Sequence, residues 1–186
     1  MTSPKAYATE ARLNALVAAT GPVPAKVTVG NITAAGPTEL TALTVPASTL
    51  AAGVKWTIEF SGYFSTGGTP PGSVTWTVNW GPVGNAISGA QIASLAIPGA
   101  GLLTSASNLG CRVRCTVWGK SATSTGTVLE VGWHTATGVA GSVSWFATAN
   151  NTGLTGNVNR DLDLAFAYTG SGVTLTTDAV QIARAA

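Results

Sequence analysis

Residues 54–80, VKWTIEFSGYFSTGGTPPGSVTWTVNW, constrain the fold of this chain more than any other stretch. Apolar and polar side chains alternate on both sides of a Gly/Pro-rich loop, and a period of two is typical of strands with one buried face. The buried faces are expected to hold Trp56 and Phe60 in the first strand, and Trp76 and Trp80 in the second. We therefore expect a central hairpin whose aromatic side chains anchor a β-sandwich core.

The same alternation returns along the rest of the chain, with turn residues between the segments. Trp133 and Trp145 share the parity of the neighbouring aliphatic residues, so we count them with the core anchors. The further predicted strands cover residues 41–45, 91–97, 109–118, 127–134, 142–149, 161–168 and 172–182. No helical pattern separates them. Eight or nine such strands predict an all-β fold, an antiparallel β-sandwich of jelly-roll type.

Residues 1–37 differ in pattern from the rest and are predicted to form a short helical arm and a linker, followed by the sandwich at 38–186. Ser3 is a candidate N-cap and Pro4 a first helical residue, while Gly21 and Pro22 would end the helix. An alternating patch at 26–32 predicts an extra edge strand, in this chain or on a neighbouring one.

The predicted helix carries a narrow apolar stripe, and a helix this short must pack against something to be stable. It either packs back on its own sandwich or docks on a partner, and the linker that follows favours docking. The candidate partner-anchoring residues are Tyr7, Leu13, Leu16 and Val17.

Charged residues make up only 9% of the chain, against roughly 25% in an average soluble domain. No run approaches the ~18 apolar residues of a membrane-spanning helix. The exterior is therefore built from Thr, Ser, Asn, Ala and Gly, which suits permanent contact with neighbouring molecules or, alternatively, a secreted β-domain. The N-terminal residues show no apolar signal segment, so we expect the chain to mature in a cytoplasm.

The net charge of +2 is scattered, and Arg112 and Arg114 form the only tight basic pair. This pattern argues against nucleic acid and against an anionic membrane as partners. Cys111 and Cys115 share one face of a strand about 13 Å apart, four steps of ~3.3 Å, which is too far for a disulfide. With one His in the chain, zinc would lack ligands, so both thiols are expected in the core.

No residue pattern in the sequence is typical of a catalytic, metal-binding or cofactor-binding site. Asp161 and Asp163 are the only close carboxylate pair, and their parity opposite Leu162 predicts that they face solvent. His134 stands alone near a strand end, and Trp118 shares a face with the two arginines, which makes a weak platform for a sugar. We therefore expect no catalytic, metal-binding or cofactor-binding residues.

Four segments carry a resemblance to a known family: LTVPASTLAAGVKWTIEFSGYFST, VTWTVNWGPVG, LGCRVRCTVWG and DLDLAFAYTGSGVTLTTDAVQIAR. Together they make residues 43–184 similar to the jelly-roll (TNF-like) domains of tailed-bacteriophage virion proteins, of the head-decoration and head-fibre type. The chain departs from that pattern in a longer Gly/Ala loop at 98–108 and in Gly53-Val54, where a polar residue usually follows the glycine.

The resemblance implies a homotrimer that is made in the host cytoplasm and resides in the virion. We expect a non-enzymatic capsid decoration protein that binds the major capsid protein or another virion protein through its N-terminal arm. One alternative is a tail, collar or baseplate appendage that contacts a host receptor through loops 66–72 and 98–108. Another is a carbohydrate-binding, lectin-like module.

Overall fold

The computed structural model describes residues 26–27, 30–33, 35–69, 71–99, 105, 107–134, 142–170 and 172–185. These residues form eleven strands and one 3-10 turn, η1 (Ala86–Ser88). The strands are β1 (Lys26–Val27), β2 (Gly30–Ile32), β3 (Thr38–Val45), β4 (Lys55–Thr66), β5 (Ser73–Gly81), β6 (Ala90–Pro98), β7 (Leu109–Ser121), β8 (Ser124–His134), β9 (Ser142–Asn151), β10 (Arg160–Thr169) and β11 (Val173–Ala185).

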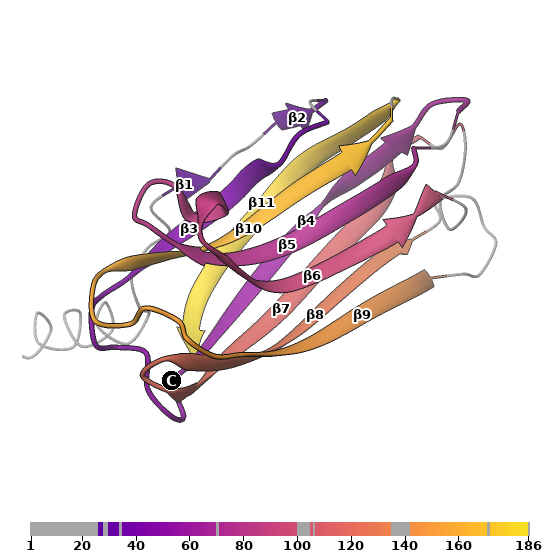
Figure 1. Ribbon diagram of the computed structural model, residues 1–186. Helices are drawn as coiled ribbons and strands as arrows, with labels where there is room; N and C mark the ends of the chain where they lie inside the picture. Colours follow the sequence, from indigo (N-terminus) through magenta and orange to yellow (C-terminus); the bar gives the residue numbers. More distant parts are fainter. Residues whose placement is uncertain are drawn as a thin grey trace, which may run out of the picture.

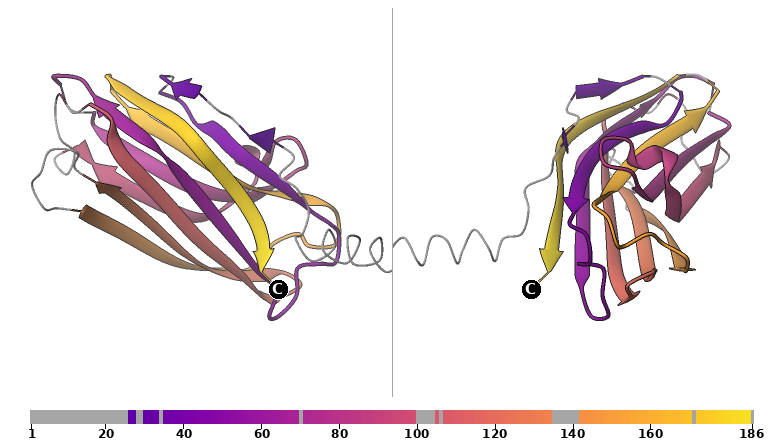
Figure 2. Two further views of the ribbon diagram at one scale, coloured as in Figure 1. Left: turned by 180° about the vertical axis from the view of Figure 1, so that it is seen from behind. Right: turned by 60° about the vertical axis from the view of Figure 1, so that its left-hand side comes forward.

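The strands form two antiparallel sheets that pack face to face as a β-sandwich (Figure 1). The five-stranded sheet has the order β1-β3-β10-β5-β6, and the six-stranded sheet has the order β2-β11-β4-β7-β8-β9. Figure 2 shows the two layers from behind and from the side, with the C-terminus at one end of β11. The all-β, two-sheet architecture is thus the one that the alternation predicts.

The predicted hairpin of residues 54–80 is wrong, because β4 and β5 lie in opposite sheets. β4 pairs with β11 and β7, whereas β5 pairs with β10 and β6. Their aromatic faces meet across the core instead: Phe60 and Trp76 have ring centroids 5.1 Å apart, and those of Trp56 and Trp80 are 6.3 Å apart. Alternation identifies the buried face of each strand but not the neighbour that covers it.

The core lies between the two sheets and takes the inward side chains of nearly every strand. Trp56, Phe60, Trp76 and Trp80 are all buried there. The register places Trp133 opposite Cys111 and Trp145 opposite Val131, but the side chains of these two tryptophans lie outside the described part of the chain.

One edge of the sandwich is closed by hydrogen bonds between the sheets. The carbonyl oxygen of Ile92 in β6 accepts from Thr127 Oγ1 at 2.9 Å and from Asn151 Nδ2 at 2.7 Å. Thr127 belongs to β8 and Asn151 to β9, so β6 packs beside the last two strands of the opposite sheet. This edge is therefore held by polar contacts as well as by the core.

The connection from β5 to β6 folds back over the outer face of the five-stranded sheet, where η1 packs against β5 and β10. Two glycines allow this close approach. A Cβ at Gly81 would lie 2.4 Å from the Ala86 carbonyl oxygen, and one at Gly89 would lie 2.2 Å from the Gly81 Cα. Part of the outer face of this sheet is consequently covered by protein.

The predicted extra edge strand at 26–32 is present as two short strands. β1 pairs with β3 at the edge of one sheet, and β2 pairs with β11 at the edge of the other. Between β2 and β3, the side-chain hydroxyl and the backbone N–H of Tyr168 donate to the carbonyl oxygens of Thr33 and Ala35, respectively. The chain is thus fixed where it crosses between the sheets.

The predicted N-terminal helix lies outside the described residues, as do Tyr7, Leu13, Leu16 and Val17. The division of the chain at residue 37 stays a prediction.

Candidate interaction surface

The outer face of the six-stranded sheet carries a row of side chains that runs across five neighbouring strands. Glu59 of β4 stands opposite Arg114 of β7, which stands opposite Glu130 of β8, and Glu130 stands opposite Phe146 of β9. On the other side of Glu59, Gln181 of β11 continues the row. Because paired residues in an antiparallel sheet point to the same face, this register makes one continuous exterior surface.

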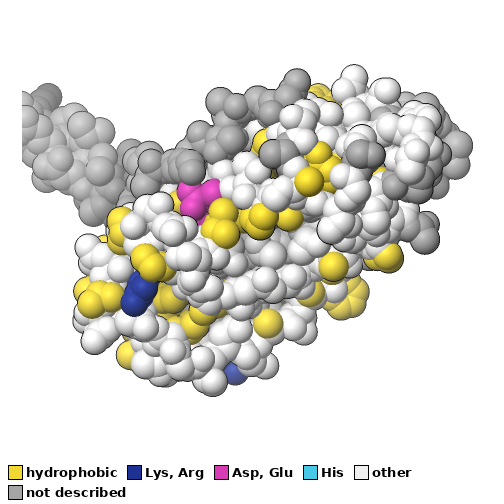
Figure 3. All heavy atoms as spheres, turned by 45° about the horizontal axis from the view of Figure 1, so that its top comes forward, with side chains coloured by type: hydrophobic (Ala, Val, Ile, Leu, Met, Phe, Trp, Pro, Cys, Tyr) yellow, Lys and Arg dark blue, Asp and Glu magenta, His cyan; other side chains and the backbone are white. Residues whose placement is uncertain are grey.

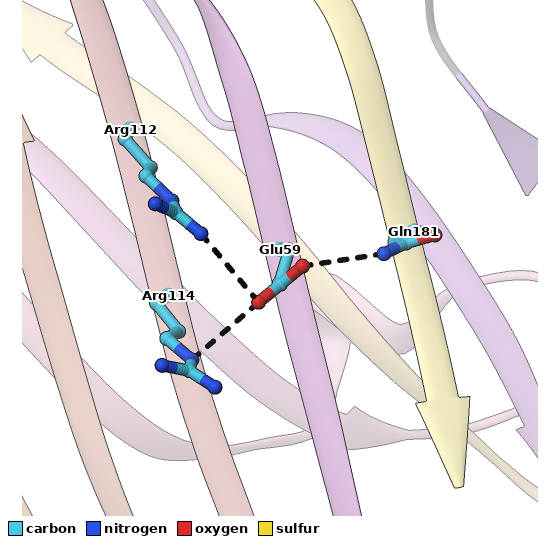
Figure 4. Close-up of polar contacts among 4 residues, drawn as sticks. All are labelled: Glu59, Arg112, Arg114 and Gln181. Atoms are coloured by element: carbon cyan, nitrogen blue, oxygen red, sulfur yellow. Dashed lines mark hydrogen bonds and ion pairs between the residues drawn. The ribbon is translucent and has the colours of Figure 1, made fainter.

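Glu59 is the centre of the polar contacts on this face (Figure 4). Its Oε1 atom lies 3.4 Å from Arg114 Nε and 3.8 Å from Arg112 Nη2, and its Oε2 atom accepts from Gln181 Nε2 at 3.2 Å. The arginine side chains are more than half exposed, so these pairs add at most about 1 kcal/mol each to stability. Glu59 thereby offsets part of the positive charge of the two arginines.

A groove of about 460 Å³ lies between β4, β7 and β11 on the same face. It is lined by Glu59, Ser61, Arg112 and Gln181 and by residues 179–180 of β11. A β-bulge interrupts β11 between Thr177 and Ala179 at this place. The groove therefore combines polar planar side chains with a short apolar wall.

Among the side chains that the structure describes on this face, three large hydrophobic ones are exposed: Tyr63, Val128 and Phe146. Phe146 is 75% exposed, and it lies diagonally across from Val128, because Phe146 pairs with Glu130 and Thr148 pairs with Val128. Side chains at such diagonal positions are close enough to form one apolar spot. The face thus presents exposed apolar groups beside the charged residues around Glu59.

The outer face of the five-stranded sheet contains an acidic pair, Asp161 and Asp163, that residue parity predicts to face solvent. That prediction is wrong: Asp161 is 2% exposed and Asp163 is 0% exposed. They lie on β10, between β3 and β5 in the middle of the sheet, and the covering η1 turn packs against the same strand. Asp161 accepts from Thr44 Oγ1 and from the backbone N–H of Gly84, each at 2.7 Å.

Asp163 lies in a different environment from Asp161. Its Oδ1 atom accepts from the backbone N–H of Asn79 at 3.0 Å and from Asn79 Nδ2 at 2.8 Å. Burial raises the pKa of Asp163 from 3.8 to about 7; the hydrogen bonds from Asn79 oppose this rise, and the nearby carboxyl group of Glu39 adds to it. Glu39, itself buried on β3, was not singled out from the sequence, because a single acidic residue at a strand start gives no local signal.

The two cysteines are free and buried in β7, as predicted. Burial raises the pKa of both Cys111 and Cys115 to about 12. They flank Val113 on the core face, where thiols pack as small apolar groups.

Trp118 is only partly exposed, because its indole ring lies against Gly126 of β8, where an added Cβ would come within 2.3 Å of Trp118 Cε2. The indole ring therefore packs against the sheet and does not project from it as a surface on which a sugar could stack. His134 ends β8 opposite Gly110, and its side chain lies outside the described residues.

The two loops proposed for receptor contact lie together at one end of the sandwich. The Ser105 backbone N–H donates to the Gly67 carbonyl oxygen at 2.8 Å, and the Gly99 N–H donates to the Gly72 carbonyl oxygen at 2.8 Å. A Cβ at Gly99 would lie 1.9 Å from the Pro71 carbonyl oxygen, so the backbones approach closely. The described parts of loops 66–72 and 98–108 are therefore joined into one tip.

Among the described residues, no three or more His, Cys, Asp or Glu side chains gather in a way that could hold a metal ion. The described part of the chain also contains no helix that is long and apolar enough to cross a membrane.

The fold and this surface define a two-sheet antiparallel β-sandwich with a sparsely charged exterior. Comparison with known protein families and with curated protein sequences finds no match for the chain.

Proposed function

We propose that this chain is a non-enzymatic structural component of a bacteriophage virion, a capsid decoration protein of jelly-roll type. In this proposal it forms a homotrimer and binds the shell, through the major capsid protein or another virion protein, by residues 1–37. The observation that carries the proposal is the outer face of the six-stranded sheet. It combines the polar contacts around Glu59 with exposed apolar groups that include Phe146.

The nesting of the terminal strands supports the jelly-roll assignment. β3 and β4, near the start of the sandwich, pair with β10 and β11 at its end, each pair in a different sheet. This pairing brings the start and the end of the sandwich together in both sheets. A jelly roll has the same feature, because it is a long antiparallel pair of chain segments wrapped around one core.

The exterior also supports a role in assembly. Figure 3 shows one face on which only a few charged side chains lie among uncharged polar groups, backbone and scattered apolar groups. Surfaces with few charges repel neighbouring copies weakly, so they favour permanent contact. On the outer face of the six-stranded sheet, Glu59 offsets part of the positive charge of Arg112 and Arg114.

Deletion of residues 1–21 tests the attachment. Full-length and shortened proteins are added to purified shells that lack the decoration, and bound protein is counted after sedimentation. The shortened protein is expected to keep its β-sheet circular dichroism and to lose binding to the shells. Equal binding by a folded, shortened protein would contradict attachment through the arm.

A second candidate function, a tail, collar or baseplate appendage that contacts a host receptor, is favoured by the joined tip of loops 66–72 and 98–108. Copy number separates the two functions, with hundreds of copies per particle for a shell decoration and a dozen or fewer for a tail part. A glycan array tests the lectin-like alternative with the Glu59 and Arg112 groove as the candidate site.

A further inference from the structure

A β-bulge in β3 brings Glu39 to the outer face of the five-stranded sheet. Leu164 of β10 stands opposite Thr41, but the next residue, Ala165, stands opposite Glu39, so Leu40 is the extra residue of the bulge. Strict alternation from Ala42, which faces Asp163, would have turned Glu39 toward the core. The bulge instead lets Leu40 join the core and places Glu39 on the face that carries Asp163.

The second carboxylate oxygen of Asp163 is unpartnered. The backbone N–H and the side-chain amide of Asn79 both donate hydrogen bonds to Oδ1, whereas Oδ2 is buried and has no hydrogen-bond partner. An ionised carboxylate can only accept hydrogen bonds, and a buried charge without a partner is costly. A protonated carboxyl group offers an O–H donor, and the neighbouring Glu39 carboxylate can accept it.

We propose that Glu39 and Asp163 share one proton, and that loss of this proton as the pH rises loosens the beginning of β3 from β10. The loosening occurs there because two adjacent buried negative charges repel each other. The bulge at Leu40 has already interrupted the regular ladder, so the first residues of β3 are the part that separates most easily.

Among the described side chains of β10, β5 and the connection that covers them, none brings a positive charge to the outer face beside Asp163. On β10, Asp161 lies on the same outer face, and its two carboxylate oxygens accept hydrogen bonds from Thr44 and Gly84. Arg160 has the opposite parity on this strand. On β5 the neighbour is the uncharged Asn79, and residues 82–89 of the covering connection contain no ionisable side chain. On β1, Lys26 stands in register with Ala42, and its side chain lies outside the described residues.

The direction of the pH effect follows from the raised pKa of Asp163, about 7 in the folded protein against 3.8. Below about pH 4 both folded and unfolded chains are protonated at this group, and the stabilisation is fully present. Between pH 4 and 7 only the folded chain keeps the proton, so the folding equilibrium constant falls with rising pH, by at most about a thousandfold. Above about pH 7 this group causes no further change.

Urea unfolding between pH 4 and 8.5 tests the pair in the full-length protein. The wild type is expected to lose stability up to about pH 7, and Asp163→Asn to lack that decline, because the amide is uncharged. Asp178→Asn, the same change at an exposed position of β11, is the matched control and should keep the wild-type profile. A decline of equal size in Asp163→Asn would overturn the proposal.

A titration of ¹³C-labelled aspartate by NMR gives a second readout that does not depend on unfolding. The Asp163 carboxyl carbon is expected to titrate near pH 7 in the wild type. In Glu39→Gln, whose side-chain amide can donate to Oδ2, its midpoint should move to lower pH. An Asp163 midpoint near 4 in the wild type would overturn the proposal, as would recovery of stability at pH 8 on adding 5 mM Ca²⁺, which would make the pair a cation site.

If residues 1–37 attach the protein to a shell, opening at the start of β3 weakens that attachment above pH 7; this consequence rests on the proposed function. Hydrogen exchange of the β3 amides, corrected for the intrinsic effect of pH, should show faster opening in the wild type than in Asp163→Asn at pH 8. If the isolated protein behaves in this way but shell binding is constant with pH, the shared proton stands and its link to attachment fails.

Discussion

Phe60 of β4 and Trp76 of β5 meet across the core with their ring planes inclined by 55°, and they belong to opposite sheets. Trp76 also contacts Phe166 of β10, with ring centroids 4.9 Å apart. One aromatic cluster therefore joins two strands of the five-stranded sheet to the centre of the six-stranded sheet. Tilted contacts of this kind add about 0.5–1.5 kcal/mol each beyond the area that they bury.

We expect Phe60→Ala to lower the free energy of unfolding by about 3–5 kcal/mol, because it leaves a cavity where the sheets meet. Tyr63→Ala removes an aromatic ring from the exposed face of the same strand, and it should cost less than about 1 kcal/mol. Urea unfolding followed by tryptophan fluorescence measures both. Equal losses in the two variants would show that the β4–β5 contact does not support the core.

Gly62 is expected to reject any side chain. A Cβ there would lie 2.1 Å from the Thr176 carbonyl oxygen and 2.9 Å from Phe60 Cζ, where β11 bends at its bulge. Gly62→Ala should therefore reduce stability by about 1–3 kcal/mol. Gly36→Ala, at a position with no atom within 4 Å of an added Cβ, should leave the thermal midpoint within a degree or two. A neutral Gly62→Ala would contradict the close approach of β4 and β11.

Asp161 is expected to hold the connection between β5 and β6 against the sheet. In Asp161→Ala both carboxylate oxygens are lost, so the Thr44 hydroxyl and the Gly84 N–H lose the acceptor that each has in the wild type. The predicted loss is about 1–3 kcal/mol, with faster hydrogen exchange at Gly84. Unchanged exchange at Gly84 would mean that the connection is held by other contacts.

The two thiols should be inert in the folded protein. Because burial raises the pKa of Cys111 and Cys115 to about 12, almost no thiolate is present at pH 8, and a disulfide reagent such as DTNB should react only after unfolding. Ser61→Cys places a thiol at an exposed site on β4 and provides the reactive control. Rapid labelling of the native wild type would contradict the buried placement.

The contacts between copies are expected to involve the outer face of the six-stranded sheet. Phe146→Ser should shift the protein toward monomers in light-scattering measurements after size exclusion. Val158→Ser removes an exposed apolar side chain from the connection between β9 and β10, and it should leave the oligomer unchanged. If Phe146→Ser leaves the mass unaltered, the copies meet through another surface.

Alternation predicted the strands and their buried faces well, because each strand has a core on one side. In β7, for example, Cys111, Val113 and Cys115 are buried, while Arg112 and Arg114 are exposed, as their parity requires. The same rule does not determine which strands pair, so it predicts a hairpin of β4 and β5 although these strands lie in different sheets.

The acidic pair shows a second limit of sequence patterns. The parity of Asp161 and Asp163, opposite to that of Leu162, predicts exposure, but β10 is a central strand and protein covers its outer face. Glu39 reaches that face only because of the bulge at Leu40, and a bulge cannot be recognised from residue parity alone. The exterior groove at Glu59 likewise depends on strand order and on the bulge in β11.

The most direct test of the proposed role is quantitative mass spectrometry of particles purified from a culture in which the gene for this chain is expressed in its own genomic setting. The proposal predicts hundreds of copies of the chain per particle, and their loss when residues 1–21 are deleted. The purified protein should also have three times the mass of the 18.5 kDa chain. Absence of the chain from the particles, or a solitary monomer that turns over a substrate, would contradict it.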